Sequence, residues 1–537
     1  MKTRTWLLLI ATLTLTAAHG QELTRQDTLR GTITPERKWW DVLKYDVAVE
    51  PDYASKTIRG SNVITFKTLS AGSIMQIDLQ EPMQLDSARL NAEPVRYERN
   101  GNVYLLYLAT PLPKGAQATL RLVYSGKPKE ARNPPWDGGW IWARDRKNRP
   151  WMSVACQGLG ASVWYPCKDH QSDEPDLGAS LSMTVADTLV AVGNGRLSAK
   201  TPVQNGKVTY SWTVKNPINN YNIIPYIGKY VHWSESFAGE KGNLDCDYWA
   251  LDYELDVAKK QFTQVAPMLK CFEHWFGPYP FYEDGYKLVQ APHLGMEHQS
   301  AVAYGNKFGN GYLGRDLSGT GWGLKWDFII VHESGHEWFG NNITSKDLAD
   351  MWIHESFTNY SETLYTTCEF GVKAGDDYCI GSRRNIDNDG PIIGIYGVNR
   401  EGSGDMYPKG GSMIHNIRQL VSDDEKFRMI LRGLNETFRH QTVTANDIEQ
   451  YMSKHSGIDL SAIFKQYLTT TMIPNLEYRV KGNVTSYRWT NVVQGFVMKV
   501  KLADGTWLSP TANWSTMKTP AAVVPDRNFY ITTSKAD

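Results

Sequence analysis

The sequence lacks an excess of charge of either sign. Its 537 residues include 57 lysines and arginines and 57 aspartates and glutamates, so the formal net charge at pH 7 is zero. Proteins that bind nucleic acid or anionic membranes mainly through electrostatics carry basic surfaces, because those partners are polyanions. The balanced charge of this chain therefore does not indicate binding to nucleic acid or to an anionic membrane. The 41% content of hydrophobic residues is typical of ordinary globular cores.

Long hydrophobic runs are also scarce. The clearest is WLLLIATLTL at residues 6–15, which is shorter than the ~18 residues that a membrane-spanning helix needs. It follows the basic residues Lys2 and Arg4 and precedes small residues that end at Gly20, which is the pattern of a secretory signal peptide. We therefore predict a signal peptide at residues 1–20 and an exported protein, periplasmic or secreted, without stable membrane insertion.

Cysteine is infrequent, with six in the chain, and no pair of cysteines has zinc-finger spacing. An exported protein can form disulfides, but six cysteines allow about fifteen complete pairings and the sequence does not choose among them. Free buried thiols are equally compatible with the pattern. The sequence also shows no internal repeat and no low-complexity segment.

The hydrophobic pattern divides the chain into three parts. Short segments with period two, separated by turn residues, predict an all-β domain at residues 21–245. The period then changes to three and four, which predicts a mainly helical domain at residues 246–470. Apolar residues from Leu255 to Phe272 mark one long helix at its start, which ends before Gly277 and Pro278. Residues 471–537 alternate again, with a hairpin signal at Asp504-Gly505, and predict a small C-terminal β-domain. The expected fold class is therefore multidomain α+β.

The most informative segment, VHESGHEWFGNNITSKDLADMWIHE, lies in the helical part at residues 331–355. His332 and His336 are four residues apart, so on a helix both imidazoles lie on one face and can bind one ion. Catalytic zinc sites use three protein ligands and leave one position for water. Glu355 supplies the third ligand, and Glu333, one residue from His332, is placed to act as a general base.

A second helix is predicted around Glu355, because apolar residues recur three and four apart from Ile353 to Leu364. Glu362 lies two turns after Glu355 on the same face. It is a candidate to accept a hydrogen bond from a ligand imidazole and so to fix its tautomer. A solvated surface glutamate is the alternative. The pattern predicts one Zn²⁺ per chain and hydrolysis by metal-activated water.

Three further segments accompany the metal-binding pattern: CQGLGASVWYPC at residues 156–167, HLGMEHQS at residues 293–300 and DMYPKGG at residues 405–411. In order, spacing and sequence, the four segments resemble the aminopeptidase N family of gluzincin metallopeptidases, which also contains leukotriene hydrolase. The resemblance covers roughly residues 40–470. It implies a saddle-like N-terminal β-domain and a thermolysin-like catalytic domain.

The resemblance also implies roles for individual residues. It places Gly295, Met296 and Glu297 against the substrate, with Glu297 and Gln157 binding the free α-amine of a peptide. A carboxylate suits an ammonium ion, because a charge-assisted hydrogen bond is stronger than a neutral one. Tyr407 takes the place of the family's catalytic tyrosine, whose hydroxyl donates to the oxyanion of the transition state.

This sequence departs from the family pattern at several positions. His298 stands where the family has asparagine, Glu337 stands where it has glutamine, and His354 precedes the third ligand in place of asparagine. The resemblance as a whole predicts a zinc-dependent aminopeptidase that acts on peptides with a free N-terminus. Two alternatives stay open: a thermolysin-type endopeptidase, and a catalytically silent peptide-binding protein on the same scaffold. The sequence leaves the oligomeric state open.

Overall fold

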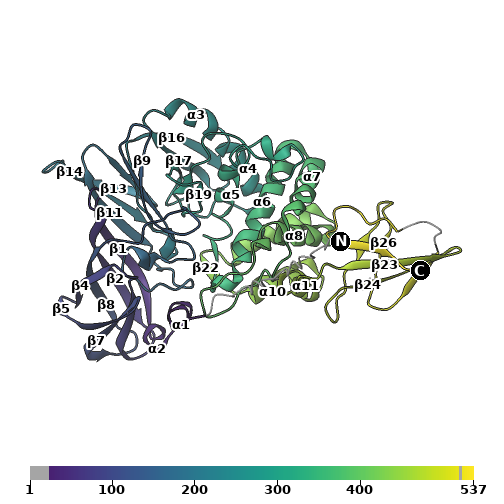
Figure 1. Ribbon diagram of the computed structural model, residues 1–537, viewed down its shortest axis with the longest axis horizontal. Coiled ribbons are helices and arrows are strands. Elements are labelled where there is room, and N and C mark those ends of the chain that lie inside the picture. Colours follow the sequence, from purple (N-terminus) through teal and green to yellow (C-terminus); the bar gives the residue numbers. More distant parts are fainter. Residues whose placement is uncertain (1–22, 519–522) are drawn as a thin grey trace, which may run out of the picture.

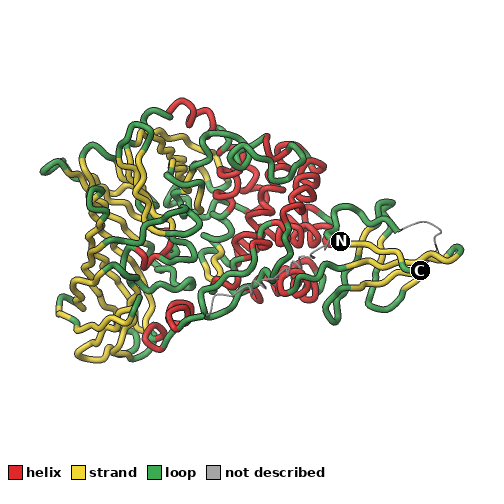
Figure 2. The backbone as a smooth tube through the Cα atoms, viewed as in Figure 1, coloured by secondary structure: helices red, strands yellow, loops and turns green. Residues whose placement is uncertain are grey.

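The computed structural model describes residues 23–518 and 523–537, so the predicted signal peptide at residues 1–20 lies outside the described residues. Figures 1 and 2 show three regions in a row: a β-rich region, a mainly helical region in the middle, and a small β-region formed by the end of the chain. This arrangement confirms the expected multidomain α+β fold. Within the described ranges, no helix is both long and apolar enough to cross a bilayer.

A large sheet forms the base of the N-terminal region. Along its long strands, buried and less buried residues alternate, because successive side chains point to opposite faces of a sheet. Neighbouring strands are antiparallel except for the parallel pair β1 and β11. In the described residues its order is β13-β14-β11-β1-β2-β8-β4-β5. The bounds are β1 (Trp40–Asp52), β2 (Thr57–Thr68), β4 (Gln84–Leu90), β5 (Glu93–Pro94), β8 (Gln117–Gly126), β11 (Ala179–Ala186), β13 (Arg196–Lys200) and β14 (Lys207–Val214).

Two smaller sheets and several short helices complete this region, and all three sheets share one buried hydrophobic cluster. The sheets have the strand orders β3-β7-β6 and β12-β15-β10-β9. Their bounds are β3 (Gly72–Asp78), β6 (Arg96–Asn100), β7 (Val103–Leu112), β9 (Gly139–Arg144), β10 (Pro150–Ala155), β12 (Val190–Val192) and β15 (Tyr226–Gly228). The helices are α1 (Arg25–Gly31), α2 (Pro35–Lys38) and the 3-10 helices η1 (Ala161–Val163) and η2 (Asn220–Asn222).

A further sheet joins the β-rich region to the helical region. Its order is β16-β17-β18-β20-β19, with β16 (Tyr230–Gly239), β17 (Gly242–Leu251), β18 (Tyr286–Gln290), β20 (Val302–Tyr304) and β19 (Gly295–Met296). The short strand β19 is an edge strand and pairs only with β20 in the described part of the chain. Residues 245 and 246, between which the sequence predicts a domain boundary, both lie inside β17, so the division into domains stays a prediction.

The helical region surrounds the segment with the metal-binding pattern. Its helices are α3 (Leu255–Phe262), α4 (Val265–Phe276), α5 (Phe328–Gly335), α6 (Trp352–Phe370), α7 (Val372–Ser382), α8 (Pro408–Val421), α9 (Asp424–Thr437), α10 (Ala445–Ser456) and α11 (Ser461–Thr469). Short elements connect them: η3 (Trp322–Leu324), β21 (Ile343–Ser345), η4 (Leu348–Asp350), η5 (Arg383–Asn385), η6 (Gly404–Met406) and β22 (Gln441–Val443).

The prediction of one continuous helix here is wrong, because the structure has two helices, α3 and α4, with a break at residues 263–264. The expected end before Gly277 is confirmed, since α4 ends at Phe276. Pro267 explains the break. A proline inside a helix lacks the N–H for the bond to residue i−4, and its ring clashes with that carbonyl. At the third position of α4, Pro267 avoids both penalties, since the first N–H groups of a helix have no partner within it.

The C-terminal β-region packs on the helices rather than standing apart. Its Leu476 and Trp489 belong to the same buried hydrophobic cluster as the helical region. The predicted hairpin at Asp504-Gly505 is confirmed, because β25 and β26 pair around it. The bounds are β23 (Asn475–Lys481), β24 (Val484–Thr490), β25 (Val500–Lys501), β26 (Trp507–Leu508), β27 (Ser515–Lys518) and β28 (Thr532–Lys535).

Candidate active site

Helix α5 carries both histidines of the metal-binding pattern. Its N-terminus is capped by Asp327, whose side chain accepts hydrogen bonds from the backbone N–H groups of Ile329 and Ile330. The helix ends at Gly335, one residue before His336, yet His336 keeps helical backbone angles of φ −63° and ψ −18°. The imidazoles of His332 and His336 therefore lie on one face, with ring centroids 5.0 Å apart.

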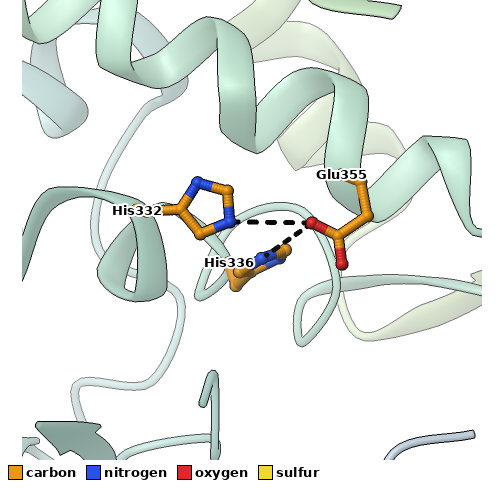
Figure 3. A group of neighbouring side chains, drawn as sticks. All are labelled: His332, His336 and Glu355. Atoms are coloured by element: carbon orange, nitrogen blue, oxygen red, sulfur yellow. Dashed lines mark ion pairs between the residues drawn. The ribbon is translucent and has the colours of Figure 1, made fainter. Parts of the chain in front are cut away.

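Helix α6 brings Glu355 to these histidines (Figure 3). Its Oε2 atom lies 3.6 Å from Nε2 of His332 and 3.3 Å from Nε2 of His336. The two helices approach closely where Gly335 faces Ser361, since a Cβ at position 335 would lie 2.6 Å from the Ser361 hydroxyl. Close packing therefore accounts for a glycine inside this helix, where it would otherwise cost about 1 kcal/mol relative to alanine.

The other nitrogen of each imidazole is held by a neighbour. His332 Nδ1 lies 2.7 Å from Oε1 of Glu362, and His336 Nδ1 lies 2.9 Å from the carbonyl oxygen of Phe339. Both acceptors require an N–H at Nδ1, so the lone pair is at Nε2, which faces Glu355. Glu362 itself is buried, and Tyr378 donates a hydrogen bond of 2.6 Å to its other oxygen.

The three residues fit a zinc ion. Within the described ranges, the buried Oε2 of Glu355 has no hydrogen-bond partner, which is costly unless a cation accepts its lone pairs. The ligand atoms of His332, His336 and Glu355 all lie within 4.8 Å of one another. Two imidazoles and one carboxylate are a donor set of catalytic zinc sites.

Glu333 extends from α5 beside these ligands and lines the cleft. It is 9% exposed, and burial raises its pKa to about 7. A group that titrates near neutral pH can both accept and return a proton. Gly295 of β19 makes room for this carboxylate, because a Cβ at position 295 would lie 2.6 Å from Oε1 of Glu333.

Tyr407 approaches the histidines from the start of α8. Its ring centroid lies 5.9 Å from that of His332, and its side chain is 37% exposed. The following residues fix the start of this helix: Lys409 is buried and its Nζ donates to the Thr470 carbonyl oxygen over 2.7 Å. A Cβ at Gly410 would lie only 1.9 Å from the Ser356 hydroxyl. Lys409 therefore ties the start of α8 to the end of α11, and Gly410 allows α8 to approach α6 closely.

Glu297 follows β19 and is 2% exposed. Its Oε1 atom accepts hydrogen bonds from Gln157 Nε2, at 2.5 Å, and from the Tyr221 hydroxyl, at 2.9 Å. Its backbone oxygen accepts from Asn341 Nδ2 at 2.7 Å. The structure thus brings Gln157, which comes from the N-terminal region, to the carboxylate that the resemblance pairs with it.

Two histidines near the pattern have structural roles. His354 Nε2 accepts a hydrogen bond of 2.9 Å from the backbone N–H of Ser345, and His354 is not in the groups of described side chains that could hold a metal ion. His298 Nδ1 lies 2.6 Å from the hydroxyl of Tyr226. His298 is fully buried, and burial lowers its pKa well below the usual range, so this imidazole is neutral. Neither departure from the family pattern alters the ligand set.

A single cleft of about 970 Å³ contains these groups. The predicted site residues are among those that line it: Gln157, Gly295, Met296, Glu297, His332, Glu333, His336, Glu355, Glu362 and Tyr407. Tyr221 and Asn341, which hold Glu297, are not among the predicted site residues. Tyr221 lies outside the recognised motifs, and Asn341 lies in the gap between His336 and Glu355. Only the fold brings Tyr221 to the carboxylate of Glu297 and Asn341 to its backbone oxygen.

Comparison with known proteins gives a consistent result. Residues 261–390 match the peptidase family M1 domain. The chain is 24% identical over 336 residues to aminopeptidase B of Mus musculus, a match that covers 58% of this chain and 48% of the relative. It is 22% identical over 455 residues to aminopeptidase N of Lactobacillus helveticus, covering 79% of this chain and 50% of the relative. The chain thus spans about half the length of these curated relatives.

The fold also matches solved structures. An M1 zinc metallopeptidase from Deinococcus radiodurans has a TM-score of 0.67 and 20% sequence identity, and the match covers 81% of this chain and 96% of that one. A related structure is a two-domain M1 zinc metallopeptidase bound to L-tryptophan, with a TM-score of 0.69 and 21% identity over 81% of this chain and 96% of that one. At 20–21% sequence identity, this structural similarity shows that the chains share a fold.

Proposed function

We propose, from the premise that this chain belongs to the aminopeptidase N-type gluzincin family, that it is a zinc-dependent aminopeptidase that removes N-terminal residues from peptides. One observation carries the proposal. The ligand atoms of Glu297, Glu333 and His336 lie within 4.8 Å of one another. An amine bound at Glu297 is therefore only one residue away from the bond that a water molecule activated by Glu333 can attack.

The substrate backbone has a natural place along β19. This edge strand offers unpaired backbone groups, to which an extended peptide can add as a further strand. Because the amine binds at Glu297, after the end of β19, the peptide runs antiparallel to the strand, past Met296 and Gly295. The first peptide bond then lies beside Glu333, whose carboxylate is next to Gly295.

The chemistry divides among few groups. His332, His336 and Glu355 would hold Zn²⁺, which would supply Lewis-acid polarisation of the carbonyl and lower the pKa of a water molecule so that it can lose a proton near neutral pH. Glu333 accepts the proton of that water and returns it to the leaving amine. The Tyr407 hydroxyl, on the other side of the histidines, donates to the carbonyl oxygen as negative charge develops there.

The decisive experiment compares free and blocked N-termini. We expect hydrolysis of aminoacyl reporter substrates and of tripeptides, loss of this activity with a chelator, and no hydrolysis of the N-acetylated forms. Glu297→Ala is expected to remove the discrimination between free and blocked substrates. Efficient cleavage of the acetylated peptides would favour a thermolysin-type endopeptidase. Absence of any turnover with one bound zinc per chain would favour the silent peptide-binding scaffold.

The base has its own test. Glu333→Gln preserves shape and removes proton transfer, so kcat should fall by about 10²–10⁴-fold while zinc remains bound. Glu369→Gln, an exposed position near the end of α6, is the matched control and should leave kcat unchanged. Near-normal turnover in Glu333→Gln would show that another group accepts the proton.

Export is the last part of the proposal. The basic start and short apolar run within residues 1–20 support a cleaved signal peptide. N-terminal sequencing of protein from a cell fraction outside the cytoplasm should begin near Gln21. An intact N-terminus in the cytoplasmic fraction would contradict export.

A further inference from the structure

Tyr221 and Gln157 bind the same oxygen of Glu297. Tyr221 is 2% exposed and lies in η2 of the N-terminal region. Its hydroxyl donates to Oε1 over 2.9 Å, and Gln157 Nε2 donates to Oε1 over 2.5 Å. The other oxygen, Oε2, takes no part in these two hydrogen bonds. The carboxylate therefore has one occupied oxygen and one that is available to a ligand.

The position of the Tyr221 hydroxyl is fixed by its neighbours in η2. The carbonyl oxygen of Asn220 accepts a hydrogen bond of 2.9 Å from the hydroxyl of Tyr165. Asn222 Nδ2 donates over 2.8 Å to Oδ1 of Asn341, whose amide in turn donates to the backbone oxygen of Glu297. The segment that carries Tyr221 is therefore linked to Glu297 twice: by the Tyr221 hydroxyl to the carboxylate, and through Asn222 and Asn341 to the backbone oxygen.

This arrangement has a specific physical effect on the carboxylate. Two donors on Oε1 use the lone pairs of that oxygen and prevent rotation of the carboxyl group. Both donors stabilise the ionised form, which burial alone would disfavour. Glu297 lines the cleft, and Oε2, which takes no part in the two bonds to Oε1, can accept a charge-assisted hydrogen bond from an ammonium group there.

We propose that Tyr221 is a positioning residue for the α-ammonium group of the substrate and acts by holding Glu297 with Oε2 toward the cleft. The inference rests on the proposed aminopeptidase function and adds a residue to it. Its consequence is selective: loss of the hydroxyl weakens the binding of ligands that carry an α-amine and spares ligands that lack one.

A pair of inhibitors isolates the amine. L-leucine hydroxamate and 4-methylpentanoyl hydroxamate share the side chain and the metal-binding group and differ only in the α-amine. Their dissociation constants, measured by calorimetry on the zinc-loaded protein, give an amine preference as a ratio. In Tyr221→Phe we expect this ratio to fall roughly tenfold or more, as for loss of a hydrogen bond to a charged group. The KM of aminoacyl substrates should rise, with a much smaller change in kcat.

Two controls separate positioning from packing. Tyr124→Phe removes a buried hydroxyl of the N-terminal region that donates to the Ala48 carbonyl oxygen and contacts neither η2 nor Glu297, and it should leave the ratio unchanged. In a Glu297→Gln background, Tyr221→Phe should cause little further loss, because the two residues act through one contact. Equal weakening of both hydroxamates in Tyr221→Phe would identify a packing residue and overturn the inference.

The outcome also distinguishes this inference from the proposed function. If the wild-type protein binds the two hydroxamates equally, the amine site itself is absent, and both proposals fail. If the wild-type ratio is large and Tyr221→Phe leaves it unchanged, the aminopeptidase proposal stands and the role of Tyr221 is refuted.

Discussion

At the scale of single residues, the metal site depends on groups that are not ligands. Glu362 fixes His332 through a 2.7 Å contact to Nδ1, and Tyr378 in turn fixes Glu362. Such partners orient the imidazole and raise its basicity. Glu362 thus contacts a ligand imidazole, as its candidate role requires. The alternative, a solvated surface glutamate, would be exposed, whereas Glu362 is buried.

We expect Glu362→Ala to weaken zinc binding by about 10–100-fold, because the His332 ring loses the partner that sets its tautomer. Competition with a chromogenic chelator measures this directly. Glu369→Ala on the same helix is the control, since position 369 is exposed. Unchanged zinc affinity in Glu362→Ala would mean that packing alone, including the stacked ring of Phe328, orients His332.

Local sequence patterns could identify the groups that perform chemistry but not all that support them. The spacing of His332, His336 and Glu355 follows from helix geometry, so a sequence can reveal it. The role of Tyr221 cannot be recognised from local spacing, because its partner Glu297 is 76 residues away along the chain and only the fold brings the two together. The use of His354 as an acceptor for a backbone N–H is also a tertiary contact.

At the scale of elements, the contact between α5 and α6 sets the distance from the histidines to Glu355. Gly335→Ala should disturb it, because the added Cβ would lie 2.6 Å from the Ser361 hydroxyl and 3.2 Å from Thr358 Cγ2. Overpacking of this kind typically costs about 1–3 kcal/mol of stability. Denaturant unfolding and zinc affinity should both report the change.

Gly404→Ala is the matched control for this prediction. Position 404 lies at the start of η6, near the cleft, and a Cβ there would meet nothing within 4 Å. We expect its stability and zinc affinity to equal those of the wild type. Full stability in Gly335→Ala would show that Ser361 and Thr358 can move aside without displacing α6.

The edge strand β19 also makes a prediction about the substrate. A peptide that runs antiparallel to β19 carries its second residue past Gly295 toward Leu294. Half-buried Leu294, Tyr312 and Leu317 line this part of the cleft. Tyr312 packs edge-on against Phe328, with centroids 5.2 Å apart. Substrates whose second residue is large and apolar should therefore be preferred.

We expect kcat/KM for a tripeptide with phenylalanine in second position to exceed that with glycine by roughly tenfold or more, since each buried methylene contributes measurably to transition-state binding. Tyr312→Ala should reduce this ratio, and Trp136→Ala, on the exposed rim of the cleft, should not. A preference for aspartate in second position would contradict the direction assigned to the peptide.

At the scale of the whole molecule, the spacing of apolar residues along the sequence predicts the order of the three regions. It does not predict how neighbouring regions are connected. Strands and helices were distinguishable because their apolar residues recur at different intervals. Periodicity does not predict the sheet that contains β17, because its partners β16 and β18 lie on opposite sides of the predicted boundary. It does not predict the break before Pro267 either, because the apolar periodicity continues across residues 263–264 although the helix does not.

The disulfide between Cys271 and Cys368 makes a prediction for the whole fold. It joins α4 to the end of α6, the helix that carries Glu355, and closes a loop with a sequence separation of 97 residues. The bond constrains the unfolded chain, so Cys271→Ala/Cys368→Ala should lower the free energy of unfolding by about 2–4 kcal/mol. Because both cysteines lie far along the helices from the metal ligands, zinc affinity should change little.

Reductant should reproduce this loss in the wild-type protein and have no effect on the double variant. Cys379→Ala serves as the control, because Cys379 is buried and free, and its response to reductant should match that of the wild type. Since disulfides persist in oxidising compartments, this bond also fits the proposed export of the protein. If the wild-type protein unfolds identically with and without reductant, the bridge does not stabilise the fold, and the structural support for export is lost.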